Sequence, residues 1–463
     1  MNNYGRKVIE TTATEITEAN VVEIVNKAIG IHTDNQNDIN YLYNRYKGDS
    51  PIYQRTKAVR KDICNKIAIN HCNETVSFKT GYLVGEPIQY VSRSGDSDAS
   101  EKISLLNSMM LSQSKASKDE DLADWIHICG IGYRIVLASR EEESPFEIYT
   151  LDPRETFVIR STEVGNRILA GVCMVTDDDG TVIFTVYTKD SVFTLKSGEI
   201  LKTEKNTVGI VPIVEYTSGK ARLGSFEVGL PILDAIERIE SNRLDGIEQF
   251  IGALAVATNC SFEEGVTAQT IMEAGMICLK STNEQKASFD ILAKTLDQTS
   301  TQTLVDDLYH TYLSVVGMPS QGNGNTSDSS NNGAALIKNG WTGAETRAKR
   351  AEVTWRESED EMLKIVLKIC RETQSIDLRT YEILIKFTRR NYEDLASKAT
   401  VFATLINTGY VTPEDCFSIS GLVYDPTECA KRGLAWHKSV AEEQAKEATV
   451  NEQAKEATAD EQI

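Results

Sequence analysis

The sequence predicts an α+β protein that is mostly helical and divided into several parts. Three observations carry this prediction. Runs of alternating apolar and polar residues between Tyr133 and Tyr216 indicate a group of strands; two amphipathic helical segments flank a small insert between Gly229 and Pro319; and a long helical pattern follows the polar stretch Ser320–Gly333. At 463 residues, the chain is long enough for roughly two to four domains with sizeable cores.

The composition narrows the class of protein. The hydrophobic fraction is 41%, no apolar run reaches the ~18 residues of a membrane span, and the N-terminus has no apolar signal-peptide region. Nine cysteines stand singly, without a C-x-x-C pair, which is typical of reduced thiols in a cytoplasmic protein. The net charge of −19 argues against a conventional DNA-binding protein, because such proteins neutralise phosphates with Lys and Arg. It does not argue against a channel through which DNA slides without sticking.

The first 225 residues read as helices followed by strands. A helix is expected at 19–28, then a turn-rich break at 34–40, and then a second helix from Lys57 to Leu83. Two more helices are expected at 104–111 and 119–129. The strands are expected at 88–91, 133–137, 146–151, 156–159, 171–175, 181–188, 191–195 and 211–216, with a hairpin turn at 177–180.

The region from Gly229 to Pro319 begins with an amphipathic helix whose start is marked by Pro231. Its apolar residues recur mostly three or four positions apart: Ile232, Ile236, Ile239, Leu244, Ile247, Ile251 and Leu254. A polar stripe follows the same rhythm: Asp234, Glu237, Ser241, Asp245 and Glu248. A second helix is expected at 303–316, with Leu304, Leu308, Tyr312 and Val315 on one line. Short strands at 253–259 and 276–280, flanking a helical turn near 266–274, are expected between the two helices.

After the second helix, Ser320–Gly333 contains no strongly apolar residue and is too polar to pack in a core. A long helix is then expected from Ala334 to Glu372. Its spacing follows a 3.5-residue period through Ile337, Trp341, Ala344, Ala348, Ala351, Trp355, Ser358, Met362, Ile365 and Ile369. This period fits either a coiled coil or a long helix that lies across a packed domain.

The C-terminal part is predicted to hold a strand at 380–387 and three helices at 391–407, 413–419 and 426–441. The nonapeptide EQAKEATVN at 443–451 is then repeated, with two changes, at 452–460, and this segment is expected to form an acidic, solvated tail.

Motifs of catalysis are missing from the sequence. There is no G-x-x-x-x-G-K-[ST] phosphate loop, no complete dinucleotide fingerprint after Gly130-Ile-Gly132 and no G-x-S-x-G elbow. The five histidines stand apart, so metal-ligand spacing is absent. We therefore expect no catalytic residue, no metal and no cofactor, and we do not expect an enzyme.

Several stretches, in this order along the chain, resemble the portal proteins of tailed bacteriophages, in particular those of long-tailed phages of Gram-positive hosts. The matching stretches are 41–52 (YLYNRYKGDSPI), 65–88 (NKIAINHCNETVSFKTGYLVGEPI), 125–133, 151–153, 209–216 with 227–241, and 385–391 with 405–409. The resemblance covers roughly Tyr41 to Lys438, whereas residues 1–40 and the tail match poorly. It implies the portal fold: a mixed α/β wing, a two-helix stem, a small α/β clip, a long wing helix and a helical crown in a ring oligomer.

The resemblance also implies boundaries for these parts: an N-terminal arm at 1–56, the wing at 57–225 and 334–390, stem helices at 226–254 and 296–317, the clip at 255–295, the tunnel loop at 318–333, the crown at 391–440 and the tail at 441–463. By the same resemblance, a dodecameric ring at one capsid vertex forms the channel for packaging and ejecting double-stranded DNA. The implied partners are the terminase large subunit, head-completion or adaptor proteins, and the major capsid and scaffolding proteins. The implied location is the virion, and the host cytoplasm during assembly; no membrane partner is implied.

A ring subunit of this kind needs apolar residues that face its neighbours and polar residues that face the channel. We expect subunit packing through Ile232, Ile236, Ile239, Leu244, Ile247, Ile251, Leu304 and Leu308, and a channel-facing stripe of Asp234, Glu237, Ser241, Asp245 and Glu248, where an acidic wall would repel DNA and lower friction. The tunnel-loop residues expected to touch DNA are Gln321, Asn323, Asn325, Thr326, Asp328, Asn331, Asn332 and Lys338; Lys338 is the best candidate for a phosphate contact.

Two other interpretations remain open at the level of the sequence. The chain could be a cytosolic α+β enzyme in which Ser320–Gly333 is a mobile lid, or a scaffold that self-associates through the helix 337–369. Size separates the three: a portal forms a large ring, an enzyme a small closed oligomer, and a coiled-coil scaffold a dimer or trimer.

Overall fold

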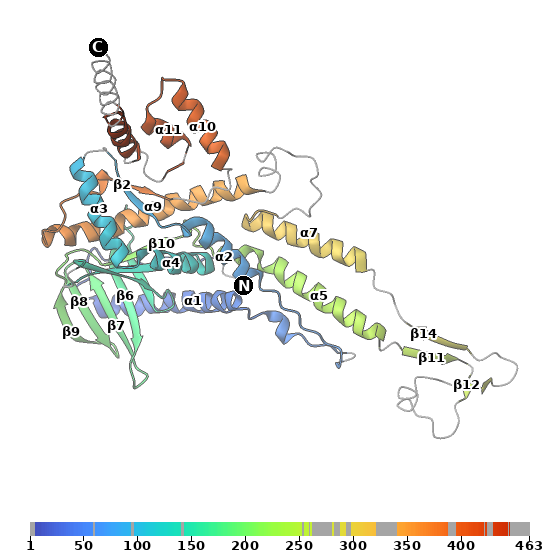
Figure 1. The fold of residues 1–463 in the computed structure, drawn as a ribbon. Coiled ribbons are helices and arrows are strands. Elements are labelled where there is room, and N and C mark those ends of the chain that lie inside the picture. The colour runs from blue at the N-terminus through green and yellow to red at the C-terminus, as the bar shows by residue number, and fades with distance from the viewer. Residues whose placement is uncertain are drawn as a thin grey trace, which may run out of the picture. The chain divides into compact units, whose positions relative to one another are not determined.

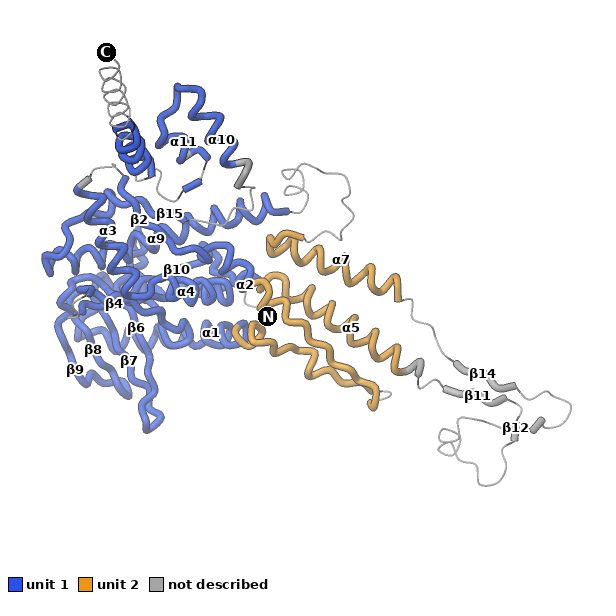
Figure 2. Tube along the Cα trace, viewed as in Figure 1, with its two compact units in different colours: residues 1–42, 76–225, 321–463 blue, residues 43–75, 226–320 orange. Residues whose placement is uncertain are grey.

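The computed structural model describes residues 5–58, 61–93, 97–139, 143–251, 254–258, 260–261, 280–281, 288–292, 298–320, 340–387, 395–420, 422–423, 429–442 and 444. The chain divides into two compact units (Figure 2). The first contains residues 1–42, 76–225 and 321–463, and the second contains residues 43–75 and 226–320.

A six-stranded sheet in the first unit confirms four of the eight strands predicted in the first 225 residues, those at 156–159, 171–175, 181–188 and 191–195. Its order is β1 (Glu10–Thr11), β5 (Thr156–Ser161), β6 (Ile168–Thr176), β7 (Val182–Thr188), β8 (Ser191–Lys196) and β9 (Glu199–Lys205), antiparallel except for the β1–β5 pair. The strand β9 was not predicted, because its charged sequence EILKTEK is exposed along the sheet edge, where a strand needs no apolar face. One face of the sheet packs against α1 (Val21–Lys47) through Val25, Phe157 and Val172 (Figure 1).

The helix α1 is longer than predicted, and the predicted break at 34–40 is wrong. The polar residues of that stretch continue the helix because Ile39 and Leu42, which follow the helical spacing, are buried. Local turn propensity is a weak signal that tertiary burial overrides.

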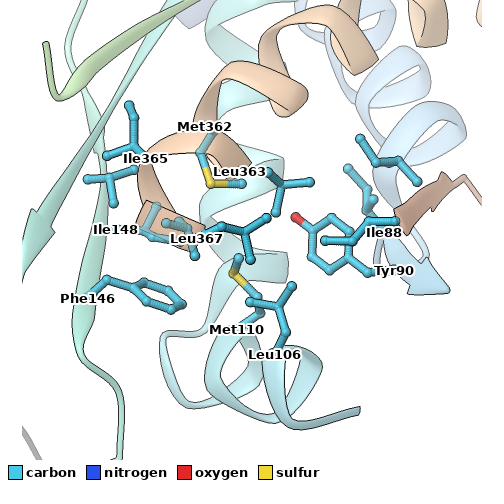
Figure 3. Close-up of a cluster of buried hydrophobic side chains, with 14 of the residues drawn as sticks. Ile88, Tyr90, Leu106, Met110, Phe146, Ile148, Met362, Leu363, Ile365 and Leu367 are labelled. Carbon is cyan, nitrogen blue, oxygen red and sulfur yellow. The ribbon is translucent and has the colours of Figure 1, made fainter. Parts of the chain in front are cut away.

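A second sheet in this unit has the order β10 (Ile213–Thr217), β3 (Ile131–Ala138) and β4 (Phe146–Leu151). Around it lie α3 (Ser97–Ser112), α4 (Lys115–Cys129), the pair β2 (Gln89–Ser92) and β15 (Ile383–Lys386), and α9 (Trp341–Glu372). Figure 3 shows Met362, Leu363 and Leu367 of α9 among side chains from α3, β2 and β4. The 3.5-residue period therefore serves a long helix on a packed domain, as the second of the two interpretations held.

Buried charges join these elements. Glu359 of α9 accepts hydrogen bonds from Lys115 Nζ at 2.8 Å and from Tyr216 OH at 2.7 Å. Asp119 accepts from the same Lys115 Nζ at 2.6 Å and from Arg134 Nη2 at 2.7 Å. Burial alone would raise the pKa of Glu359, but Lys115 and Arg134 hold it well below its usual value. Two cations thus balance two anions in the core, and removal of one would leave its partner uncompensated.

The second unit contains α5 (Leu230–Ile251) and α7 (Gln298–Val316), together with the 3₁₀ turns Pro51–Gln54 and Glu227–Gly229. The strand β11 (Leu254–Thr258) confirms the expected strand at 253–259, and it pairs with β14 (Ser288–Leu292), which was not predicted. Lys280–Ser281 forms β13 and pairs with β12 (Cys260–Ser261), while the expected helical turn at 266–274 lies outside the described residues.

The helix predicted from Lys57 to Leu83 is wrong in its first half, because α2 begins only at His71 and ends at Val84. Residues 63–70 have no helical hydrogen bonds; several of their backbone N–H groups donate instead to side chains of α5. The C-terminal helices are confirmed as α10 (Leu395–Asn407), α11 (Pro413–Ser420) and a helix at 429–442; the repeat tail lies outside the described residues apart from Ala441, Glu442 and Gln444. Among the described helices, none has the length and apolarity of a membrane span.

Candidate channel and subunit-contact elements

The two predicted stem helices, α5 and α7, pack against each other in the second unit. Gly229 lies just before α5, and a Cβ there would fall 2.5 Å from Cε2 of Tyr312 in α7, so only glycine permits this approach. Further along, Arg243 donates from Nε to Gln298 Oε1 at 2.6 Å and from Nη1 to Gln302 Oε1 at 2.6 Å. Apolar contact at one end and hydrogen bonds at the other hold the pair together.

The apolar residues expected to pack between subunits do not all reach the surface. Ile236 is buried within the chain itself, which corrects the expectation for that residue. Ile232, Ile239, Leu244 and Leu308 are half-buried, and Ile251 lies outside the residues whose side chains are described. Ile247 and Leu304 are 42% and 49% exposed, so these two remain the best-placed apolar side chains for contact with a neighbouring subunit.

The polar stripe of α5 is covered by an extended segment, residues 63–70, that we call the strap. The backbone N–H groups of Asn65, Ile67 and Ile69 in this segment donate in turn to Asp245 Oδ1 (2.7 Å), Ser241 Oγ (2.9 Å) and Glu237 Oε1 (3.0 Å). The strap therefore runs antiparallel to α5 and uses the helix side chains in place of a neighbouring strand.

The spacing of these contacts follows from the two backbone geometries. Alternate residues of an extended chain advance about 6.6 Å, and residues four apart on an α-helix advance about 6 Å. Because these two distances are nearly equal, residues 65, 67 and 69 can lie opposite residues 245, 241 and 237 over three successive contacts. The pairing uses acceptor side chains, Asp245, Ser241 and Glu237, that recur every four residues on α5. We refer to it as the strap–α5 ladder.

Basic side chains complete the ladder. Arg55 Nη2 and Lys57 Nζ each lie 2.7 Å from Asp245 Oδ2, and Arg45 Nη2 lies 2.9 Å from Asp234 Oδ1. Glu237 also accepts a hydrogen bond from Ser50 Oγ. Burial acts to raise the pKa of Asp245, but hydrogen bonds from Lys57, Asn65 and Arg55 outweigh it and lower the pKa to about 2. Asp245 is therefore a buried, ionised carboxylate that binds the strap and two basic side chains.

This arrangement corrects the expected channel-facing stripe. Glu237, Ser241 and Asp245 are buried under residues of the same unit and are not on the surface that a channel could present. Asp234 is 34% exposed while it pairs with Arg45, and Glu248 is exposed while it accepts from Asn65 Nδ2 at 2.9 Å. The role expected of these two remains a prediction.

Several residues of the ladder were missed by the sequence analysis. Arg45, Arg55 and Lys57 precede α5 by almost two hundred residues, and the donors at 65, 67 and 69 are backbone groups that carry no sequence signal. The sequence signal that could have indicated the ladder is the presence of basic residues at 45–57 that match in charge the acidic stripe of α5.

The expected tunnel-loop residues, Gln321, Asn323, Asn325, Thr326, Asp328, Asn331, Asn332 and Lys338, lie outside the described residues. Within the part of the chain that is described, no cluster of His, Cys, Asp and Glu has the geometry of a metal site.

Comparison with protein families identifies this architecture. The family model described as "Phage portal protein, SPP1 Gp6-like" matches residues 26–456, which is nearly the whole chain. The chain belongs to this family of phage portal proteins. The portal role and the portal fold predicted from the sequence are thereby confirmed, and the interpretations as an enzyme or a scaffold are not favoured.

Two of the solved structures similar to this portal protein are chains of gene transfer agent particles. A chain of the "Neck of empty GTA particle computed with C6 symmetry" is 13% identical, with a TM-score of 0.44, covering 76% of this chain and 90% of that one. A chain of the "Virion of native gene transfer agent (GTA) particle" is 12% identical, with a TM-score of 0.39, covering 83% and 94%. No curated protein sequence matches. Portal proteins are structural components of the virion capsid that assemble as a ring, rather than catalysts.

Proposed function

We propose that this portal protein forms a dodecameric ring at a single capsid vertex, through which double-stranded DNA is packaged and later ejected. The observation that carries the proposal is the match to the portal family over residues 26–456. The same match supports α5 and α7 as the stem, the strands between them as the clip, and the tunnel loop at 318–333.

The proposed partners follow from this assignment. The terminase large subunit docks on the ring during packaging, head-completion or adaptor proteins replace it, and capsid and scaffolding proteins surround the ring while it assembles in the host cytoplasm. The exposed Ile247 and Leu304 are proposed to contact the neighbouring subunit, because their burial in a ring would remove apolar surface from water.

Negative-stain microscopy of the purified full-length chain tests the ring. Wild type should give rings with a central hole, whereas Ile247→Asp together with Leu304→Asp should give small particles, because a carboxylate would be placed in each subunit contact. A matched control is Leu111→Asp, which alters an exposed leucine of α3 and should leave rings intact. Rings from the stem variant would refute the assigned contact, and small particles from wild type in the presence of scaffolding protein would refute the ring.

The proposed tunnel loop is tested with a variant that lacks residues 323–332. The purified variant should still form rings, and heads assembled with it should contain less DNA than wild-type heads. Fully packaged heads with this deletion would remove the DNA role of the loop.

A further inference from the structure

The helices α5 and α7 leave one cation and one anion without a partner. The acids of the ladder are paired with the strap and its basic neighbours, Glu240 lies 3.5 Å from Arg243, and Asp306 accepts from Gln302 at 2.8 Å. Among the described Asp, Glu, Lys and Arg side chains of the two helices, only Arg238 and Asp307 have no ion pair or hydrogen bond. Both are exposed.

Arg238 lies on the side of α5 that α7 does not cover. Residues five apart on an α-helix are separated by about 140° around its axis. Arg243 follows Arg238 by five residues and donates to Gln298 and Gln302 of α7, so Arg238 is turned away from α7. It lines a hollow of about 390 Å³ beside the turn Pro51–Gln54, where the other charged groups already belong to the ladder.

Asp307 lies on the side of α7 that α5 does not cover. Gln302 binds Arg243, and Tyr312 packs against Gly229, so these two residues mark the face of α7 that meets α5. Asp307 is five residues from each of them and therefore lies nearly opposite that face. Leu304, which is 49% exposed, precedes Asp307 by three residues and shares its outer side.

The two unpaired charges also lie at a similar level along the helices. The contacts of Gly229 with Tyr312 and of Arg243 with Gln298 show that α5 and α7 run antiparallel side by side (Figure 2). Interpolation between these contacts brings Arg238 to within about one helical turn, or about 5 Å, of the level of Asp307. A rotation about a ring axis keeps each residue at its own height, so two residues that meet between copies must lie at similar levels.

A ring uses this kind of asymmetry. In a head-to-tail ring each copy presents two different surfaces, one to each neighbour, and the two surfaces must complement each other. An unpaired cation on the outer side of α5 and an unpaired anion on the outer side of α7 meet that requirement.

We propose that Arg238 of each copy forms an ion pair with Asp307 of the next copy in the ring. The partner is a second copy of this chain, and the hollow beside Arg238 leaves room for the incoming carboxylate. A guanidinium can hold both oxygens of a carboxylate, so the pair fixes the relative orientation of two copies as well as attracting them. The proposal rests on the proposed function, because only a ring brings the outer side of one α5 to the outer side of another α7.

Charge reversal tests the pair, with rings of the full-length chain counted by negative-stain microscopy. Arg238→Glu would bring two carboxylates together in every contact, and Asp307→Arg would bring two guanidinium groups together. Because like charges at an interface repel, each change alone should lower the fraction of chains in rings at least about tenfold. The double variant exchanges the two signs and should form rings as wild type does.

An equimolar mixture of the two single variants shows whether the pair forms between copies. In an alternating ring with an even number of copies, each introduced carboxylate meets an introduced guanidinium, and every second contact is the wild-type pair. The mixture should therefore form rings although neither variant does so alone, which also shows that both variants fold. The control is Lys202→Glu, which reverses an exposed cation of β9 that lies 2.9 Å from Glu204 and should leave rings at the wild-type level.

Rings at the wild-type level in either single variant would overturn the proposal, as they would if Arg238 met DNA or another protein instead. Failure of the double variant or of the mixture to form rings would overturn it as well. Rescue in the double variant but not in the mixture would place the pair within one chain. Failure of the proposed function is distinct, because wild type itself would then form no rings, and the ion pair would fall with it.

Discussion

The strap–α5 ladder predicts a specific effect of replacing Asp245 by Asn. The side chain of Asp245 is 4% exposed and receives four donors, from Arg55, Lys57 and the two nitrogens of Asn65. Asn keeps the size of the side chain but removes its charge and turns one acceptor into a donor that faces cations. The strap should therefore detach from α5 more often, while the rest of the unit stays folded.

The magnitude follows from the pKa. The pKa of Asp245 falls from its ordinary 3.8 to about 2, so the ionised carboxylate stabilises the folded unit by about 2 kcal/mol relative to the protonated one. Complete loss of a buried partner costs about 3–5 kcal/mol, and Asn retains one acceptor, so about 2 kcal/mol is the expected loss for Asp245→Asn. An opening free energy lower by that amount accelerates amide exchange roughly 30-fold.

Hydrogen–deuterium exchange measures this directly, because the amides of Asn65, Ile67 and Ile69 are the donors of the ladder. At pH 7, peptides that cover 63–70 should exchange roughly 30-fold faster in Asp245→Asn. Asp306→Asn is the matched control: it makes the same chemical change at an exposed carboxylate of α7, which accepts a hydrogen bond from Gln302 of its own helix, and exchange of 63–70 should stay within about threefold of wild type. Unchanged exchange in Asp245→Asn would refute the ladder as a source of stability.

The pH dependence gives a second check on the same variant. Because the folded-state pKa is lowered, the stabilisation by Asp245 is fully present above about pH 4 and is lost as the pH falls towards 2. The difference in protection between wild type and Asp245→Asn should therefore be constant from pH 7 to about 4 and should vanish near pH 2. A difference that persists at pH 2 would mean that packing, rather than charge, holds the strap.

Two further predictions concern the packing of each unit. Glu359→Gln should lower the free energy of unfolding of the first unit by about 3 kcal/mol, because Lys115 and Arg134 would then share one anion. Urea unfolding, followed by the fluorescence of the buried Trp355, measures this loss, and a value below about 1 kcal/mol would contradict the role of the buried charges. Gly229→Ala should lower the free energy of unfolding of the second unit by about 1–3 kcal/mol, because its Cβ would lie 2.5 Å from the ring of Tyr312. Hydrogen–deuterium exchange in peptides of α7 measures this loss, and adding Tyr312→Leu should restore protection from exchange if the clash is the cause.

Much of the fold could be predicted because its signals are local. The alternation in Val182–Thr188 and the three- and four-residue spacing in α5 each depend on a single element that buries one face. The strand β9 and the second half of α1 escaped prediction because their state depends on neighbours in the fold, an edge position in one case and the buried Ile39 in the other.

The candidate site was harder to predict for a related reason. A polar stripe on a helix shows that its members share a face, but the same period arises whether that face meets solvent or a chain that supplies donors. Asp245 and Asn65 are 180 residues apart, and the donor in their shortest contact is a backbone N–H, which every residue except proline has. Nothing in the sequence of α5 alone distinguishes the two cases.

The ladder changes the electrostatic argument for the stem. The three acids Asp234, Glu237 and Asp245 lie against the three cations Arg45, Arg55 and Lys57, so within this group the charges cancel. A neutral group of paired charges projects little field beyond the Debye length of about 8 Å at physiological salt. In the proposed channel, repulsion of DNA by these two helices would rest on carboxylates that stay exposed: Glu248 of α5 and Asp306 of α7, because Asp307 is proposed to pair with Arg238 of the next copy. The acids that form the clearest pattern in the sequence of α5 therefore stabilise the subunit itself, and the exposed acids that remain for the proposed channel are divided between α5 and α7.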